Sequence, residues 1–393
     1  MAGILCLAGC GKGAASKATT DPSTVKDTGA STTAPSASSM PAAEDTLTLC
    51  MTGDILLHDE MNDAARQTDG SYNYDYLFKY LGKTIGSKDL AIVNQEVPIG
   101  GRELGVTGYP SFNAPYEMAD ALAKAGFDVV CHATNHALDK VGRGVKNTLS
   151  NWKKNHPDIE VVGIHDSNED QKKITVVEKK GIKVAILNYT YGTNGISLPS
   201  DMPYAVDLLE EKRIRDDLAR AEELADFTIV CPHWGTEYRL ETDEYQKKWT
   251  ALFRECGADL VLGTHPHVIE RIEEFRDGDK AHWTNNHGNG DMLVYYSLGN
   301  YVNWTNDFGE GIANRMVGGI AEVTLKRGAD GQVTISDHDI LPIVCHVSHN
   351  PGEISVYPLS DYTRELAAKN AIRQQDPAFS LEYCRELCKK IWR

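Results

Sequence analysis

The sequence predicts an α/β sandwich, and two observations carry that prediction. Predicted strands alternate with predicted helices over the first part of the chain, an order typical of helices packed against a sheet. Several of these strands also end in a carboxylate, amide or imidazole side chain, and open α/β sheets bind ligands at the carboxyl ends of their strands. With 393 residues, 41% of them hydrophobic, the chain can form one large domain or one domain with appendages.

The first half of the expected domain consists of strands followed by helices. The strand at 47–52 alternates apolar and polar residues and leads into Gly53-Asp54, whereas the strand at 90–96 is an apolar run with a polar end. Pro115 suits the first turn of a helix. The expected order is strand 47–52, helix 73–86, strand 90–96, helix 115–125, strand 127–132, helix 142–154 and strand 159–164.

The second half begins with a hairpin whose turn is Lys179-Lys180-Gly181. A helix at 207–224 follows, and its high charge predicts that it faces solvent. Later residues alternate around Arg327–Gly331 and predict a second hairpin. The expected elements are strands 173–178 and 182–189, helix 207–224, strand 227–232, helix 242–256, strand 259–263, a strand within 290–300 that ends in a polar loop, and strands 318–325 and 332–343.

The chain divides into four expected parts. Residues 1–10 contain Leu7-Ala8-Gly9-Cys10, which matches a bacterial lipobox and predicts cleavage before Cys10 and lipidation of its thiol. Residues 11–45 are rich in Gly, Ala, Ser, Thr and Pro without an apolar period, and they predict a disordered tether. Residues 46–345 form the expected domain. Residues 346–393 are expected to be a loop to about 360 and then a helical extension that packs on the domain.

These features predict a protein held by a lipid anchor at the extracytoplasmic face of a bacterial cell membrane, because no segment reaches the ~20 apolar residues of a membrane span. The net charge of −16 and the pI near 5.3 argue against nucleic acid as a partner, since nucleic-acid binding needs a basic surface. None of the nine cysteines forms a C-x-x-C pair. Cys50, Cys131 and Cys231 lie inside apolar runs, so we expect few disulfides.

The most informative stretch is Gly257–His267. Its apolar run ends at Gly263, where the chain can turn, and His265 and His267 follow. In an extended segment, residues i and i+2 point to the same side, and Pro266 restricts the backbone between them. We therefore expect both imidazoles to converge on one point, where imidazole nitrogen is a common ligand of divalent transition metals. The alternative is a pair of surface histidines in a turn.

The same design recurs at other strand ends, which favours the metal site over the surface turn. A polar side chain follows each of four further predicted strands, and parallel strands bring their carboxyl ends to one edge of a sheet. These side chains are Asp54, then Asn94 and Glu96, then Asn135 and His136, and finally His233.

Six motifs resemble, in order and spacing, the CapA (PgsA) family, which is associated with poly-γ-glutamate capsule biosynthesis. The resemblance covers residues 46 to about 305. The family is similar to the calcineurin-like metallophosphoesterases, so it implies a four-layer α/β/β/α sandwich with a dinuclear metal site. The motifs are Gly53-Asp54, Asn94-x-Glu96, Asn135-His136-x-x-Asp139, His233-Trp234-Gly235, Gly263-x-His265-x-His267 and Ser297-Leu298-Gly299-Asn300.

The resemblance implies a metal ligand at six positions and two divalent ions, which are Mn, Fe or Zn because a mixed nitrogen and oxygen ligand set does not choose among them. The sequence departs from the metallophosphoesterase pattern at the first strand, where the D-x-H histidine is missing and His58 is displaced. It also departs at the second strand, where the usual bridging aspartate is replaced and Glu96 is assigned as the carboxylate. The implied ligands are Asp54, Glu96, Asn135, His233, His265 and His267.

His136 matches the catalytic histidine of the same pattern. In that role it protonates a leaving group or stabilises developing negative charge. Asp139, three residues on, orients this histidine if the segment is helical. The alternatives are a structural hydrogen bond for His136 and a helix cap for Asp139.

Candidates for substrate contacts lie beside the expected metal ligands. Arg315 is a candidate for pairing with a substrate carboxylate, and a plain surface charge is the alternative. Aromatic residues just past strand ends either wall a substrate groove or pack the core. The candidates are Asn94, Trp234, Asn300 and Arg315, and the aromatic residues are Phe112, Tyr189, Tyr191, Trp234, Tyr238, Tyr301 and Trp304.

The resemblance implies a metal-dependent hydrolase or transferase that acts on poly-γ-glutamate or a related anionic polymer during synthesis, export or attachment. A membrane-bound capsule synthetase complex is the implied protein partner. One alternative is a general phosphoesterase that uses the same site, which the replaced bridging aspartate disfavours. The other is a non-catalytic scaffold that binds the polymer or the synthetase through a degenerate metal site.

Overall fold

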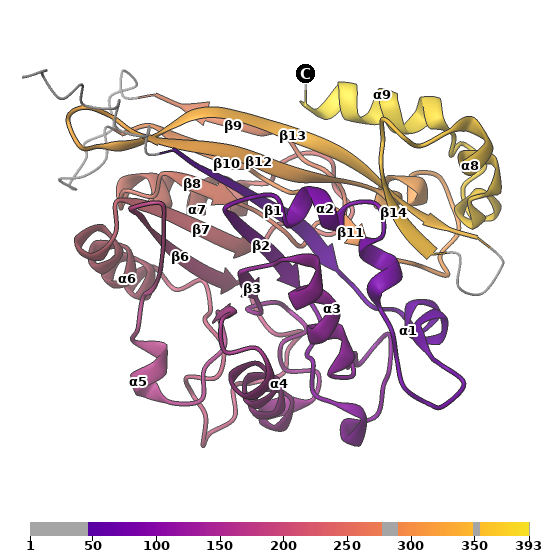
Figure 1. Cartoon of the computed structure of the whole chain (residues 1–393), viewed down its shortest axis with the longest axis horizontal. Helices are drawn as coiled ribbons and strands as arrows, with labels where there is room; N and C mark the ends of the chain where they lie inside the picture. The colour runs from indigo at the N-terminus through magenta and orange to yellow at the C-terminus, as the bar shows by residue number, and fades with distance from the viewer. Residues whose placement is uncertain (1–45, 277–289, 349–353, 393) are drawn as a thin grey trace, which may run out of the picture. The chain divides into compact units, whose positions relative to one another are not determined.

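A computed structural model describes residues 46–276, 290–348 and 354–392, so the predicted lipobox with Cys10 and the predicted tether lie outside the described residues. Two β-sheets pack face to face in this part of the chain, and helices cover their outer faces (Figure 1). The predicted four-layer α/β/β/α sandwich is confirmed. No helix of the described residues is both long and apolar enough to cross a membrane.

The first sheet joins a parallel half to an antiparallel half through its central strand, β1. On one side of β1 the next three strands run parallel to it, and on the other side the pairing is antiparallel. The strand order is β14-β13-β12-β1-β2-β3-β4, and β11 pairs with the end of β1. The strands are β1 (Thr46–Ile55), β2 (Leu90–Gln95), β3 (Val129–Cys131), β4 (Glu160–Val162), β11 (Asn300–Val302), β12 (Val317–Arg327), β13 (Val333–Val347) and β14 (Ile354–Pro358).

The second sheet has a parallel centre between antiparallel edges, in the order β5-β6-β7-β8-β10-β9. The predicted hairpin around Lys179-Lys180-Gly181 is its edge pair, β5 and β6. The strands are β5 (Thr175–Lys179), β6 (Ile182–Thr190), β7 (Phe227–His233), β8 (Leu260–Leu262), β9 (Ile272–Phe275) and β10 (Met292–Tyr295).

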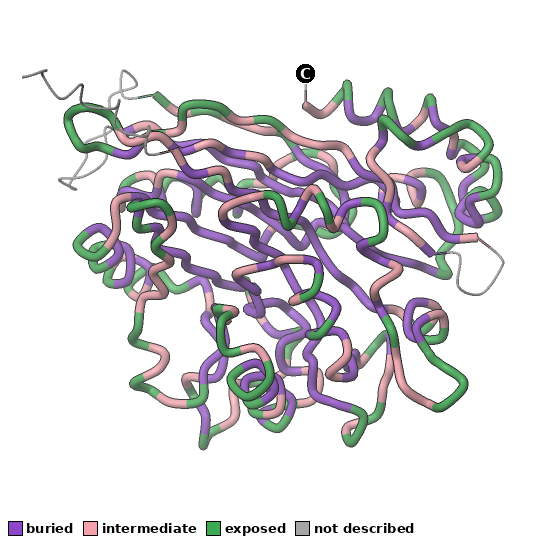
Figure 2. Tube along the Cα trace, viewed as in Figure 1, coloured by how far each residue is buried: buried purple, intermediate pink, exposed green. Residues whose placement is uncertain are grey.

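The core between the sheets follows the two-residue period of the strands. Leu47, Leu49 and Met51 of β1 point into it, whereas Cys50 points to the outer face of the same sheet. Both sheets are buried along most of their length, and exposed residues gather on the outer faces of the helices (Figure 2). The seven cysteines of the described residues are all free. Cys50, Cys131 and Cys231, which lie inside apolar runs, are buried among them.

The helices cover the two outer faces with apolar stripes. Those after β1, β2 and β3, together with the C-terminal helices, pack on the first sheet, and α6 and α7 pack on the second. The α-helices are α1 (Asp59–Ala65), α2 (Gly82–Ile85), α3 (Glu117–Ala125), α4 (Val141–Asn155), α5 (Asn168–Gln171), α6 (Glu211–Leu224), α7 (Glu244–Glu255), α8 (Arg364–Lys369) and α9 (Leu381–Trp392). The 3₁₀ turns are η1 (Asp75–Phe78), η2 (Arg102–Leu104), η3 (Ile312–Met316) and η4 (Ala371–Gln374).

Three sequence predictions about these elements need correction. The helix expected at 73–86 is the turn η1 followed by the short α2, with turns over residues 79–81 between them. The helix α6 faces solvent on one side only, since Ile214, Leu218 and Ala221 are buried against the second sheet. The loop expected over 346–360 is wrong for Ile354–Pro358, which form β14 because they pair with the end of β13.

Candidate metal centre

The predicted site residues meet where the carboxyl ends of parallel strands from both sheets come together. Asp54 lies at the end of β1 and Glu96 directly follows β2. His233 ends β7, and His265 and His267 follow β8. All five side chains are almost fully buried, between 0% and 2% exposed. The strand-end pattern of the sequence is therefore a real cluster in three dimensions.

Glycine is required at two of these strand ends because another backbone passes very close. A Cβ on Gly53 would lie 1.9 Å from the carbonyl oxygen of Gly299, and one on Gly263 would lie 2.1 Å from that of Tyr296. The neighbouring Asp54 N–H donates to the same Gly299 carbonyl at 3.0 Å. The absence of a side chain thus lets the segment 296–299 pack against both strand ends and fixes where the carboxylate of Asp54 points.

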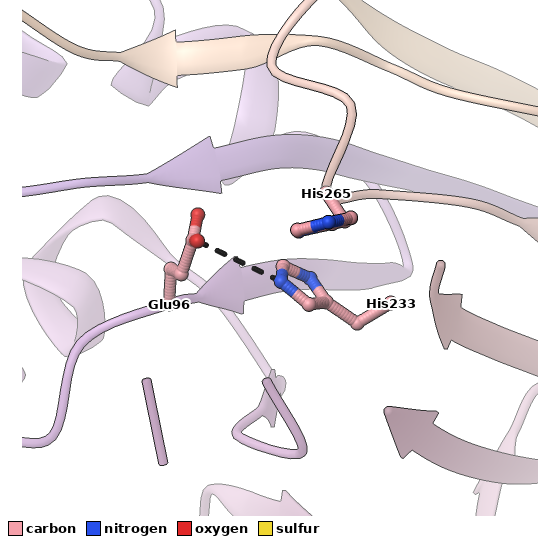
Figure 3. Close-up of side chains that lie close together, drawn as sticks. All are labelled: Glu96, His233 and His265. Carbon is pink, nitrogen blue, oxygen red and sulfur yellow. Dashed lines mark ion pairs between the residues drawn. The ribbon is translucent and has the colours of Figure 1, made fainter. Parts of the chain in front are cut away.

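Glu96 is the shared member of two groups of ligand-type atoms. Its Oε1 lies 3.6 Å from Nε2 of His233 and 3.5 Å from Nε2 of His267 (Figure 3 shows the His233 pair). One group joins Asp54, Glu96 and His267, and the other joins Glu96, His233 and His265. Within each group the ligand atoms lie within 4.8 Å of one another. Glu96 therefore belongs to both groups, and the assignment of Glu96 over Asn94 as the carboxylate ligand agrees with this geometry.

Several atoms of the cluster are buried without a hydrogen-bond partner, which is the main sign that the residues fit a metal ion. Both carboxylate oxygens of Glu96 and Nδ1 of His265 are in this state. A buried polar atom that has lost water without gaining a partner costs roughly 1–3 kcal/mol. Coordination of a cation removes that cost, and carboxylate with imidazole is a donor set that suits Mn, Fe or Zn.

The electrostatics of the cluster also favour a cation. Burial would raise the pKa of Glu96, yet the neighbouring His267 and His233 lower it to about 2. Burial would lower the pKa of His267, yet Glu96 and Asp54 raise it to about 10. The pKa of His265, which has two histidine neighbours, lies well below its ordinary value because of burial and those neighbours. The two carboxylates thus stabilise a positive charge placed beside them.

The backbone at the two histidines differs from the sequence prediction. The sequence predicts an extended segment, but His265 has φ 99° and His267 has φ 58°, a region that residues other than glycine rarely adopt. The imidazoles do converge, with ring centroids 5.8 Å apart. Their convergence comes from this strained turn and not from strand alternation, and such strain is typical of functional sites.

Two asparagines flank the cluster. The Asn94 side-chain amide donates to Oδ1 of Asp54 at 2.8 Å, so Asn94 holds a metal-ligand candidate in place. Oδ1 of Asn135 lies 2.9 Å from Nε2 of His233, which puts its amide oxygen, the predicted ligand atom, at the edge of the same group. The amide nitrogen of Asn135 donates to Oδ1 of Asn194 at 3.3 Å.

His136 and Asp139 form a pair beside the cluster. Nδ1 of His136 lies 2.8 Å from Oδ2 of Asp139, which also accepts the backbone N–H of Phe112 at 2.7 Å. The segment is a series of turns, with the Asp139 N–H donating to the His136 carbonyl at 3.0 Å, and not a helix. The Phe112 ring packs edge-on against His136, with centroids 4.7 Å apart. The imidazole is therefore fixed by a carboxylate on one side and an aromatic ring on the other.

A cleft of about 790 Å³ opens above the cluster. Arg315, 7% exposed, lies in its wall with its guanidinium 3.5 Å from the centre of the Tyr238 ring and bonded to Asp307 at 2.7 Å. His136 and His267 reach the cleft from the floor. Its lining also includes Phe112, Asn135, Asp139, Asn194, Glu237, Tyr238 and Trp304, and three of these are aromatic residues that the sequence placed near the site.

Three of the four predicted substrate contacts do not reach this cleft. Trp234 is fully buried, and its indole N–H donates to the Tyr296 carbonyl at 2.9 Å within the core against the second sheet. Asn94 is buried against Asp54, and Asn300 is buried against His267. Asn94 lies inside β2, Asn300 begins β11 and Trp234 directly follows β7, and in each case the packing of other chain segments covers the side chain. Arg315 alone of the four lines the cleft.

Two cleft residues were not among the predicted site residues. Glu237 approaches His265 and His267 closely enough to form a third ligand group. Its position two residues after His233-Trp234-Gly235 was the available signal. His58 lines the cleft beside Phe112, with ring centroids 5.1 Å apart, and burial together with His267 lowers its pKa to about 4. The displaced histidine thus reaches the site, although not as a member of any ligand group found among the described residues.

The chain resembles known proteins over most of its folded part. A family model described as "Bacterial capsule synthesis protein PGA_cap" matches residues 48–305. The chain is 25% identical over 321 residues to the PGA biosynthesis protein CapA of Bacillus subtilis (strain 168), an alignment that covers 76% of this chain and 73% of that protein. It is 26% identical over 271 residues to the capsule biosynthesis protein CapA of Bacillus anthracis, an alignment that covers 66% of this chain and 61% of that protein.

Solved structures show weaker similarity. A putative 5'-nucleotidase from Staphylococcus aureus in complex with alpha-ketoglutarate has a TM-score of 0.47 and 14% identity, over 76% of this chain and 54% of that chain. A 5'-nucleotidase precursor from Thermus thermophilus has a TM-score of 0.44 and 14% identity, over 88% of this chain and 58% of that chain. The chain thus spans a little over half the length of these two structures.

Proposed function

Because the chain belongs to the bacterial capsule synthesis protein PGA_cap family, we propose that it is a metal-dependent hydrolase or transferase of the cell envelope that acts on a polyanionic capsule polymer of the poly-γ-glutamate class. The role in capsule synthesis rests on the family. The chemistry rests on the residues of the site.

The observation that carries the proposal is the buried cluster around Glu96, whose carboxylate oxygens have no hydrogen-bond partner and lie beside three histidines. Asp54, Glu96 and His267 would hold one divalent ion, and Glu96, His233 and His265, with the amide oxygen of Asn135 beside them, would hold a second. Bound divalent ions supply polarisation of the group under attack and activation of water at neutral pH. A buried set of charged and unpartnered groups this size has no comparable use in fold stability, since apolar packing would serve better.

The residues beside the cluster supply proton transfer. Asp139 accepts the Nδ1 proton of His136, so Nε2 is the nitrogen left to exchange a proton with substrate. Hydrolysis of an amide breaks its C–N bond, adds water across it and leaves a carboxylate and an amine. His136 would give the proton that the leaving nitrogen needs, and Asp139 would stabilise the imidazolium before that transfer.

Arg315 fits a polymer that carries carboxylates. The net charge of −16 repels such a substrate at long range, so a cation must attract it locally. The guanidinium carbon lies 3.5 Å from the centre of the Tyr238 ring in the cleft wall, where the group pairs with the exposed carboxylate of Asp307. A substrate carboxylate would take the place of Asp307.

The proposal includes a place in the cell. Lipidation of Cys10 would anchor the chain at the extracytoplasmic face of the membrane, and the segment 11–45 would let the domain reach polymer as a membrane-bound capsule synthetase complex extrudes it. This location would bring the site to the substrate.

The test is an activity screen of the full chain loaded with Mn²⁺, Fe²⁺ or Zn²⁺. Poly-γ-glutamate is the main substrate, and size-exclusion chromatography follows its chain length while an amine-reactive dye follows new amino groups. We expect shorter chains and new amines, or transfer of the polymer when a nucleophile such as glycylglycine is added. Turnover of p-nitrophenyl phosphate without any change in the polymer would replace the proposal by a phosphoesterase. Polymer binding that survives Asp54→Ala, with no turnover of either substrate, would replace it by a scaffold.

A further inference from the structure

Glu237 lies on the segment after β7, on the cleft side of the metal centre. A carboxylate oxygen of this residue and one ring nitrogen from each of His265 and His267 all lie within 4.8 Å of one another. Unlike Asp54 and Glu96, Glu237 is exposed, and it belongs to the cleft lining. The centre therefore has a third carboxylate on the side from which ions and substrate arrive.

The backbone around Glu237 is fixed relative to the two histidines. The Tyr238 N–H donates to the Pro266 carbonyl at 2.7 Å, and the Trp234 N–H donates to the Thr264 carbonyl at 3.0 Å. The segment between these two bonds begins with Gly235 at φ 90° and ends with Tyr238 at φ 66°. One bond on each side of Glu237 thus ties its segment to the segment that carries both histidines, so the backbones of the three residues are held at a fixed spacing.

The rest of the centre leaves room for this carboxylate. The first strand supplies Asp54 but has Ile55 and Leu56 where a second ligand could follow, and both are apolar. The Nδ1 atom of His265 is buried and has no hydrogen-bond partner, which a ligand role for this ring would explain. In addition, the two buried carboxylates balance only half of the charge of two divalent ions, and an uncompensated buried charge is costly.

We propose that Glu237 is a further metal ligand, which closes the centre on its cleft side together with His265 and His267. This inference rests on the proposed metal centre and adds a ligand to it. The centre then has three carboxylates, of which Asp54 and Glu96 are buried and Glu237 is exposed. Glu237 takes the place of the histidine ligand that is missing after the first strand. Its side chain borders the cleft, as His267 and Asn135 do, and Glu237 is the exposed one of the three carboxylates.

The test is a metal-binding titration that needs no substrate. The full chain is stripped with a chelator and titrated with Mn²⁺, and electron paramagnetic resonance measures the free ion. Glu237→Gln is compared with the wild type and with Glu241→Gln, a control that removes the same charge from an exposed position nearby on the same segment. We expect Glu237→Gln to lower the affinity of the weaker Mn²⁺ site by at least about tenfold, because loss of a residue that only supports a metal ligand already costs roughly 10- to 100-fold. Glu241→Gln should bind as the wild type does.

A titration in about 1 M KCl separates ligation from simple attraction between charges. At this salt concentration the screening length is about 3 Å, so an exposed charge that acts only through its field loses most of its effect. A tenfold difference that persists in salt supports the inference. Equal affinities of Glu237→Gln and wild type, or a difference that vanishes in salt, would overturn it while leaving the metal centre intact. A wild type that binds no Mn²⁺ would instead overturn the proposed metal centre itself, and Glu237 with it.

Discussion

Oδ1 of Asn300 lies 3.0 Å from Nδ1 of His267, and the amide nitrogen of the same side chain donates to the His267 carbonyl at 2.9 Å. Asn300 thus holds His267 through two contacts, one to its ring and one to its backbone. The contact uses the Nδ1 proton and turns Nε2 toward Glu96, 3.5 Å away. A metal-binding histidine commonly has its other nitrogen held in this way, so the polar end of the Ser297–Asn300 motif is part of the centre's support.

Removal of this support should weaken metal binding. We expect Asn300→Ala to lower the affinity for Mn²⁺ by roughly 10- to 100-fold, because His267 loses its orientation. The measurement is a Mn²⁺ titration, with circular dichroism to show that the variant is folded. Asn306→Ala is the matched control, since Asn306 lines the cleft but is exposed and lies outside the ligand groups. Equal affinities of Asn300→Ala and wild type would contradict the role of Asn300.

The metal content itself is the most direct prediction. Elemental analysis of the chain purified without chelators should give near two equivalents of transition metal, because two ligand groups share Glu96. The double variant His265→Ala/His267→Ala should lose both. His156→Ala controls for the loss of a histidine. His156 lies outside the ligand groups, and its Nε2 is 2.8 Å from Oδ1 of Asp120. Near one equivalent would mean that only one group is filled, and none after reconstitution with Mn²⁺ or Zn²⁺ would refute the centre.

His136 should matter for turnover and not for metal content. His136→Ala should reduce the rate on the polymer by roughly 100-fold or more, the usual range for a lost proton donor, while metal content stays near normal. Asp139→Asn should give a smaller loss, because the imidazole keeps its place against Phe112 but loses its carboxylate partner. Chain-length analysis of the polymer and elemental analysis check the two halves of the prediction. Full activity of His136→Ala would show that another group moves the proton.

His165, a buried histidine outside the metal centre, should make the stability of the fold depend on pH. Nε2 of His165 lies 2.7 Å from Oδ2 of Asp207, and its Nδ1 lies 3.8 Å from Asp170. Burial alone would lower the pKa of His165, but the two aspartates raise it to about 9, from 6.5. A raised pKa in the folded state stabilises the fold below the unfolded pKa, and this contribution disappears as the pH rises through the folded pKa.

We therefore expect the free energy of unfolding to lose on the order of 3 kcal/mol between pH 6.5 and about 9, which is the shift expressed as energy. Urea unfolding across this interval measures it. His165→Gln should be less stable than the wild type at pH 6.5 and should lack this part of the decline. Parallel curves for wild type and variant would show that the Asp207 pair does not titrate as inferred.

Lipidation of Cys10 predicts that the protein is attached to the membrane in cells. Cys10→Ser removes the only thiol of the lipobox, so the variant should appear in the soluble fraction when the wild type sediments with membranes. Immunoblots of fractionated bacteria check this, and Cys6→Ser is the control for the neighbouring cysteine. Membrane retention of Cys10→Ser would mean that some other part of the chain holds it there.

The order of the elements could be read from the sequence because each signal is local. The apolar runs at β2, β7 and β8 and the amphipathic pattern of α3, α4 and α7 depend on residues a few positions apart. Elements that local pattern does not support were missed, such as β14, which is a strand only because it pairs with β13, and the short β9, which pairs with β10. The break between η1 and α2 was missed because the apolar pattern of the sequence continues across it.

The sequence by itself determined which residues carry chemistry: the side chains at the strand ends include Asp54, Glu96, His233, His265 and His267, and these do cluster. Only the tertiary structure decided what each one faces. The strained turn at His265 and His267, the burial of Trp234 and the approach of Glu237 all depend on segments that are distant in sequence and close in space. The physical reason is that strand alternation sets the side of a sheet on which a residue lies, whereas its partners beyond the strand end are set by the packing of other chain segments.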